Sequence, residues 1–194
     1  MSESDLIAAC VKNDKTAKKQ LFEMYYKKLA FISSRYCKNA SQAEDVLMNG
    51  YTHIFYLLHT YKNNSKLSVD EFITHHFIAY IISYIKSIRN EYYVASTVKA
   101  VEHIDNSYDL FLDNYLIDFR TINQPILLKS IQELVPSQRL IFNLHVIDGY
   151  DLSKASELLE TNEQTLKSNL EKARFNLQKV IEKNLKLNQY EQSV

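Results

Sequence analysis

The sequence predicts an all-α protein made of two small helical domains. Only two glycines and two prolines occur in 194 residues, so the strongest turn formers are too few to connect a series of tight hairpins. Apolar residues instead return at steps of three and four through long stretches rich in Leu, Ile, Lys, Glu, Gln and Ala, which is the spacing of amphipathic helices. A hydrophobic content of 46% is that of a globular chain able to bury a core.

Four helices are expected in the first half of the chain. Ser4 is the expected N-cap of the first, and Ser41 with Glu44 forms a capping-box pattern at the start of the third. The fourth is apolar on several faces and is therefore expected to be buried. The predicted bounds are residues 4–13, 16–37, 41–61 and 69–91.

Helical periodicity then weakens over an acidic and aromatic stretch, residues 93–126, which is predicted to be a linker with few helical turns. Its apolar side chains are expected to bury against the flanking domains, which would let the two domains sit together. The predicted domains are residues 1–92 and 127–190. Helices in and around the second domain are expected at residues 126–134, 137–147, 152–159 and 163–184.

Residues 151–174 have the spacing of a helix-turn-helix, with a short helix, a polar turn at 160–162 and a longer second helix. On the second helix, Leu166 and Leu170 share a stripe with Ala173 and Leu177 that is expected to face inward. The candidate DNA-binding residues on the outward face are Gln164, Thr165, Lys167, Ser168, Glu171, Lys172 and Arg174. By itself, the pattern fits a helical hairpin with a solvated polar face equally well.

Two segments carry a resemblance to a known family. Residues 127–182 resemble the fourth region of a sigma factor of the extracytoplasmic-function (ECF) group, and residues 5–55 resemble its second region. The matching residues of the fourth region are Leu134, Pro136, Gln138, Arg139, Phe142, Leu144, Gly149, Leu159, Thr165, Lys167, Ser168, Leu170, Ala173, Arg174 and Leu177. The two motifs occur in the family's order and together cover somewhat more than half of the chain.

The resemblance implies a transcription initiation factor that is not an enzyme and needs no cofactor. Its implied partners are core RNA polymerase, promoter DNA and an anti-sigma factor. By position, the residues that contact polymerase are Glu44, Asp45, Met48 and Asn49. The segment 66–89 is the counterpart of the family's promoter-melting segment, and its candidate DNA-binding residues are Lys66, His75, His76, Tyr80, Lys86 and Arg89.

The chain departs from the family pattern at several of these positions. Met48 and Asn49 stand where the family usually has Gln and Glu, and the usual Trp, Asn and Asp of the fourth helix are replaced by His75, Ile82 and Lys86. Glu160 stands in place of the turn glycine, where a left-handed conformation would cost about 1 kcal/mol. These changes, with a formal net charge of zero, leave a second hypothesis open: a sigma-like protein-interaction module with little or no promoter binding.

Other chemistry has weak support in the sequence. The N-terminus lacks the basic flank of a secretory signal, and no apolar run approaches the ~20 residues that span a bilayer, so a cytoplasmic protein without membrane insertion is expected. His53 and His59 lack the i, i+4 spacing of a helical zinc site, and no phosphate-binding glycine motif occurs. Neither a metal nor a catalytic residue is therefore expected, and Cys10 and Cys37 are expected to be core residues.

Overall fold

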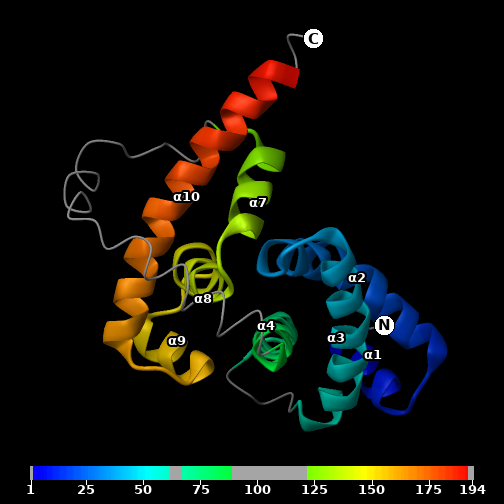
Figure 1. The fold of residues 1–194 in the computed structure, drawn as a ribbon. Coiled ribbons are helices and arrows are strands. Elements are labelled where there is room, and N and C mark those ends of the chain that lie inside the picture. Colours follow the sequence, from blue (N-terminus) through cyan, green and yellow to red (C-terminus); the bar gives the residue numbers. More distant parts are fainter. Residues whose placement is uncertain (1, 62–66, 89–121, 192–194) are drawn as a thin grey trace. The chain divides into compact units, whose positions relative to one another are not determined.

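The computed structural model describes residues 2–61, 67–88 and 122–191. All the regular structure in these ranges is helical, which confirms the predicted fold class (Figure 1). The chain divides into two compact units, Met1–Tyr84 and Ile85–Val194. Most of the predicted linker lies outside the described residues, so the domain bounds 1–92 and 127–190 and the burial of the linker's apolar side chains stay predictions. No helix in the described ranges is both long enough and apolar enough to cross a membrane.

The first unit is built around α2 and α3, which pack against each other and against α1. Its interior is apolar and closely filled, and it includes the fully buried side chains Leu29, Tyr36, Ile54 and Phe77. The elements are α1 (Glu3–Val11), α2 (Lys15–Tyr36), α3 (Ala40–Leu57), the 3-10 helix η1 (Leu58–Thr60) and most of α4 (Val69–Ser87), whose last residues fall beyond the unit boundary at Tyr84.

Two of the predicted N-caps are wrong. Helix α1 is capped by Ser2, whose hydroxyl accepts the Asp5 N–H at 3.2 Å while the Asp5 carboxylate accepts the Ser2 N–H at 3.2 Å. This capping box starts the helix before Ser4. Helix α3 is capped by Asn39, whose side chain accepts the Gln42 N–H at 2.9 Å, so Ser41 lies inside the first turn. In both cases an earlier polar side chain reached the free backbone N–H groups.

The second unit is organised by one long helix, α10 (Glu163–Glu191), which packs against α7, α8 and α9. Its core includes Leu140, Leu144, Leu177 and Ile181, each 0% exposed. The other elements are α7 (Gln124–Glu133), α8 (Pro136–Ile141), the π-helix η4 (Phe142–Ile147) and α9 (Leu152–Leu159).

The single helix predicted at 137–147 is in fact two elements, because α8 changes into a π-helical turn at Phe142. The buried Asn143 side chain donates to the Arg139 carbonyl at 2.9 Å, and the Asp148 N–H reaches back five residues to the Asn143 carbonyl at 2.9 Å. A side chain that enters the backbone ladder is a known cause of helix distortion. Periodicity alone does not reveal this change, because the apolar spacing continues through it.

A glycine permits the close approach of α3 to α4. A Cβ added at Gly50 would lie against the ring of Phe77, with Cδ2 only 2.9 Å away, and Phe77 is fully buried. Gly50→Ala is therefore expected to destabilise the protein by about 1–3 kcal/mol, because the packed ring must shift. Denaturant unfolding of the full chain measures the change. Ala43→Gly, at a buried site on the same helix, is the control for an altered helix propensity, and equal stability of Gly50→Ala and wild type would contradict the packing role.

Candidate nucleic-acid interface

The helix-turn-helix is present at the predicted residues. Helix α9 begins after Asp151, whose side chain accepts the Lys154 N–H at 2.7 Å. Helix α10 begins after Asn162, whose side chain accepts the Thr165 N–H at 2.8 Å. Capped ends fix where each helix starts, so the turn between them is confined to the three residues Glu160–Asn162.

Glu160, which stands in the glycine position of the turn, has a left-handed conformation with φ 52° and ψ 47°. The Thr161 N–H donates to the Ser156 carbonyl at 3.1 Å, and the Glu160 N–H donates to the Glu157 carbonyl at 3.3 Å. These two bonds form a Schellman motif, in which glycine is the usual left-handed residue. The turn therefore keeps the expected geometry and carries the strain of a side chain at this position.

The inward stripe of α10 is buried as predicted. Leu166, Ala173 and Leu177 are at most 1% exposed and Leu170 is 6% exposed. On α9 the buried side chains are Ala155 and Leu159. With one face of α10 buried in this way, the opposite face is turned to solvent.

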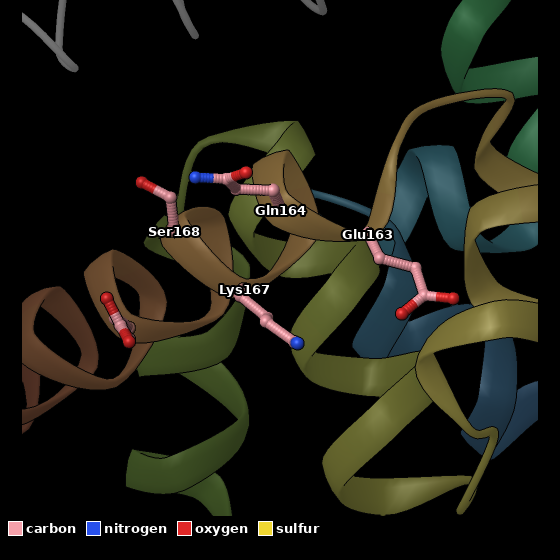
Figure 2. A pocket seen from close by; sticks show the side chains of 5 residues that line it. Glu163, Gln164, Lys167 and Ser168 are labelled. Atoms are coloured by element: carbon pink, nitrogen blue, oxygen red, sulfur yellow. The ribbon is translucent and has the colours of Figure 1, made fainter.

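The outward face of α10 carries the predicted DNA-binding residues. Gln164, Thr165, Lys167, Glu171 and Arg174 are exposed, and Ser168 and Lys172 are half-buried. An open depression of about 580 Å³ lies over this face (Figure 2). Its lining residues are Glu163, Gln164, Lys167, Ser168 and Glu171. Glu163 was not predicted from the sequence, although its position one helical turn before Lys167 places it beside that residue.

The charges on this face are mixed. Glu163, Lys167 and Glu171 follow one another at i, i+4 spacing, so an acidic side chain lies on each side of the lysine. Among the described residues, no carboxylate lies within ion-pair distance of the Lys167 ammonium. The lysine is therefore able to meet an anion, but the surface has no continuous positive stripe.

The predicted polymerase-binding residues share one face of α3. Glu44, Asp45, Met48 and Asn49 are all exposed, and Met48 is 54% exposed. Tyr56, two turns beyond Met48 on the same helix and 73% exposed, was not identified from the sequence. Exposed methionine and tyrosine among acidic side chains are suited to a protein interface, because interface cores are enriched in these two residue types.

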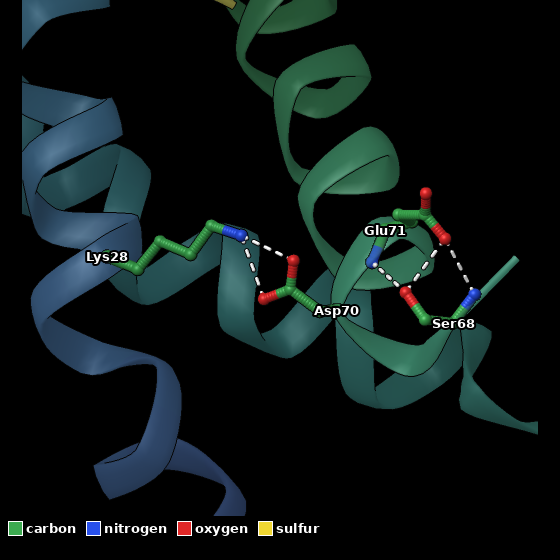
Figure 3. A network of polar contacts seen from close by, with 4 residues as sticks. All are labelled: Lys28, Ser68, Asp70 and Glu71. Atoms are coloured by element: carbon green, nitrogen blue, oxygen red, sulfur yellow. Dashed lines mark hydrogen bonds and ion pairs between the residues drawn. The ribbon is translucent and has the colours of Figure 1, made fainter.

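The start of α4 is held by two sets of polar contacts (Figure 3). The Lys28 ammonium of α2 donates to both carboxylate oxygens of Asp70, at 2.8 and 2.7 Å. Ser68 and Glu71 form a capping box, in which the Glu71 carboxylate accepts the Ser68 N–H at 2.8 Å and Ser68 Oγ accepts the Glu71 N–H at 3.2 Å. The helix that carries the predicted promoter-melting residues is thus fixed at its first turn.

Four of the six DNA-binding residues predicted in and around α4 lie within the described residues. His75, His76, Tyr80 and Lys86 are half-buried. The centroid of the His76 ring lies 4.3 Å from that of the Phe72 ring. Burial lowers the pKa of His76. These rings pack partly against one another and keep only part of their surface for a base. Ile82 is buried, and Lys66 and Arg89 lie outside the described residues.

Within the part of the chain that the structure describes, no group of three or more His, Cys, Asp or Glu side chains could hold a metal ion. Cys10 and Cys37 are both buried, as predicted.

Leu166→Ala and Leu170→Ala are each expected to destabilise the protein by about 2–5 kcal/mol, because both side chains are buried under the recognition helix. Chemical denaturation with a far-ultraviolet signal measures this. Gln164→Ala, on the exposed face of the same helix, should change stability by less than about 0.5 kcal/mol. Losses of equal size in all three variants would show that α10 has no buried side.

Glu160→Gly is expected to stabilise the protein by about 1 kcal/mol, because glycine accepts the left-handed conformation without strain. Glu160→Ala is the matched control: it removes the same carboxylate and keeps the Cβ. Thermal unfolding should rank the glycine variant above the alanine variant. If alanine is as stable as glycine, the turn is not strained.

Comparison with known proteins agrees with this architecture. The family "Sigma-70, region 4" matches residues 125–177. The structure of the sigma factor RpoE in complex with the anti-sigma factor NepR from Bartonella quintana aligns with a TM-score of 0.51 and 18% identity, over 84% of this chain and 96% of that chain. The structure of CnrH in complex with the cytosolic domain of CnrY aligns with a TM-score of 0.47 and 12% identity, over 91% and 95%. A search of curated protein sequences gave no match. Residues 125–177 thus match the sigma-70 region 4 family, in agreement with the resemblance of this segment to the fourth region of a sigma factor, and the fold is similar to that of the sigma factor RpoE.

Proposed function

We propose that the chain is a transcription initiation factor that binds core RNA polymerase and directs it to promoter DNA. The observation that carries this proposal is the capped helix-turn-helix inside the sigma-70 region 4 domain, with the outward face of α10 open to solvent. We assign it no enzymatic activity of its own and place it in the cytoplasm, with polymerase.

In this proposal the first turns of α10 enter the major groove while α9 braces them. Gln164 and Ser168 present donors and acceptors to base edges, because both line the depression on the outward face. Lys167, Lys172 and Arg174 are placed to contact phosphates, which contribute affinity but carry no sequence information themselves. The domain thus needs no large positive surface, provided that its few cationic side chains contact the phosphate backbone of the DNA.

The exposed face of α3 is the proposed polymerase-docking surface. Glu44 and Asp45 supply negative charge, Asn49 a polar amide, and Met48 and Tyr56 the apolar area that is removed from water on binding. Because Asn49 stands where the family usually has an acid, affinity is expected to depend more on apolar contact than on charge.

Promoter opening is assigned to α4 and the residues just before it. Extruding a base costs a few kcal/mol, which an aromatic surface can offset by stacking. The partly exposed rings of His75, His76 and Tyr80 are the candidates, with Lys86 on the same helix and Lys66 and Arg89 outside the described residues.

An anti-sigma factor is a further proposed partner. The RpoE structure that shares this fold is of a complex with the anti-sigma factor NepR. A partner of this kind would inhibit the chain by covering the polymerase-binding or DNA-binding faces.

The second candidate function is a sigma-like protein-interaction module without promoter binding. It is favoured by Glu163 and Glu171 on the outward face of α10 and by the zero net charge, since both weaken attraction to DNA. Two measurements separate the candidates. An initiation factor should be retained on core polymerase and should give a promoter gel shift in that complex, whereas the interaction module would fail the gel shift.

Lys167→Ala and Lys172→Ala should each weaken binding to all DNA sequences alike and reduce the slope of log K against log salt by about one unit, because each removes one phosphate contact. Fluorescence titration of the complex with core polymerase at several salt concentrations measures both effects. Lys183→Ala is the control, because Lys183 pairs with Glu133 at 3.4 Å away from the outward face. Unchanged affinity and salt slope in both test variants would remove α10 as the DNA-binding element.

A further inference from the structure

We propose that Glu171 determines promoter specificity by accepting a hydrogen bond from the exocyclic amino group of a cytosine in the major groove. This inference rests on the proposed function. Glu171 is exposed, and it lines the depression on the outward face of α10 with Gln164 and Ser168. Figure 2 shows Gln164 and Ser168 on this face.

The three side chains follow one another along the same face. Steps of four and three residues separate Gln164, Ser168 and Glu171, so successive members lie about one helical turn apart on one side of the helix. From Ser168 to Glu171 the helix rises about 4.5 Å, which is close to the ~3.4 Å spacing of stacked bases. A base edge at Ser168 therefore brings a neighbouring base pair within reach of Glu171.

The Glu171 carboxylate is available for such a contact. No ion pair is formed by it within the described ranges, although Lys167 and Arg174 lie one turn away on either side. An ionised carboxylate only accepts hydrogen bonds, so it must meet a donor when the groove closes over it. A carboxylate that is buried in the groove without a hydrogen-bond donor weakens binding, because it has lost its contacts with water.

Cytosine is the best match for this acceptor. Phosphates repel a carboxylate, and the major-groove edges of guanine and thymine present acceptors. Adenine presents a donor beside the N7 acceptor, whereas cytosine presents its N4 amino donor alone. Glu171 thus attracts one base and repels others, which is how specificity is gained at some cost in general affinity.

The neighbouring cations make the carboxylate tolerable near DNA. Lys167 is four residues before Glu171, Lys172 follows it directly, and Arg174 is three residues after it. Phosphate contacts by these cations would offset the repulsion of the carboxylate and fix the height of α10 in the groove.

The test uses the full chain bound to core RNA polymerase and a duplex DNA pool randomised across the upstream promoter element. Wild-type complex is expected to enrich cytosine at one position by about tenfold over other bases, within the range of one good base contact. Glu171→Gln should lower that preference to near parity with adenine and leave the other positions unchanged, because glutamine both donates and accepts. Glu182→Gln is the matched control, because Glu182 is an exposed residue of the same helix, accepts a hydrogen bond from the Gln178 amide at 3.3 Å and lines no part of the depression.

A second measurement changes the DNA instead of the protein. Replacing the preferred cytosine pair by a thymine pair should weaken binding of the wild type and of Glu182→Gln by about tenfold, but change binding of Glu171→Gln by less than about twofold. Matching thermal unfolding of the three proteins excludes a folding defect as the cause.

The outcomes separate the inference from the function on which it rests. If Glu171→Gln keeps the wild-type cytosine preference while Lys167→Ala weakens binding to all sequences, the specificity role is overturned and promoter binding stands. If the wild-type complex enriches no sequence beyond core polymerase alone, promoter recognition fails, and the inference fails with it.

Discussion

The burial of one side of α10 is the constraint on which the second unit depends. Leu166, Leu170, Ala173, Leu177 and Ile181 form a continuous apolar stripe, and α7, α8 and α9 pack around the helix that carries it. Because side chains on a helix have fixed angular positions, burying this stripe fixes which residues face away from the core. The core and the candidate DNA-binding face are therefore two consequences of one helical pattern.

Polar contacts inside this packing fix the register of the helices. Asn184 of α10 is 4% exposed and donates to Ser130 Oγ of α7 at 3.0 Å, and Asn176 donates to the buried Gln138 of α8 at 2.9 Å. A sliding of α10 by one turn would leave these buried groups without partners, which costs more than the bonds contribute. Arg139 adds a further restraint, since its guanidinium donates to two carbonyl groups near the end of α7, both at 2.8 Å. The apolar stripe gives the helix its orientation, and the polar pairs select one position along it.

Much of this organisation could be predicted from the sequence, because it depends on spacing. The bounds of α9 and the inward leucines of α10 follow from the apolar periodicity. The turn follows from the place of Glu160 at the position that glycine usually fills. The caps of α1 and α3 were predicted wrongly, since several adjacent polar side chains compete for the same N–H groups and only the geometry decides among them. The π-helical turn at Phe142 depends on a local bond of the Asn143 side chain to the Arg139 carbonyl, and the close approach at Gly50 depends on a tertiary contact with Phe77. Apolar spacing displays neither of these. Tyr56 and Glu163 were not predicted as site residues for another reason. Each is a candidate only because the structure shows it exposed on the same face as the predicted residues.

The mixed charge on the outward face of α10 has a physical consequence for how such a domain discriminates. Sequence-independent attraction to DNA grows with the number of phosphate contacts, so a face made only of lysine and arginine would bind many sequences. Glu163 and Glu171 lower that general attraction, while Lys167 remains available between them. Binding by this face then requires the carboxylates to meet donors, and few base edges supply them. Glu163 and Glu171 thus lower the electrostatic attraction to DNA of any sequence, and they would raise the ratio of specific to non-specific binding. That ratio matters more than affinity when competing sites are abundant.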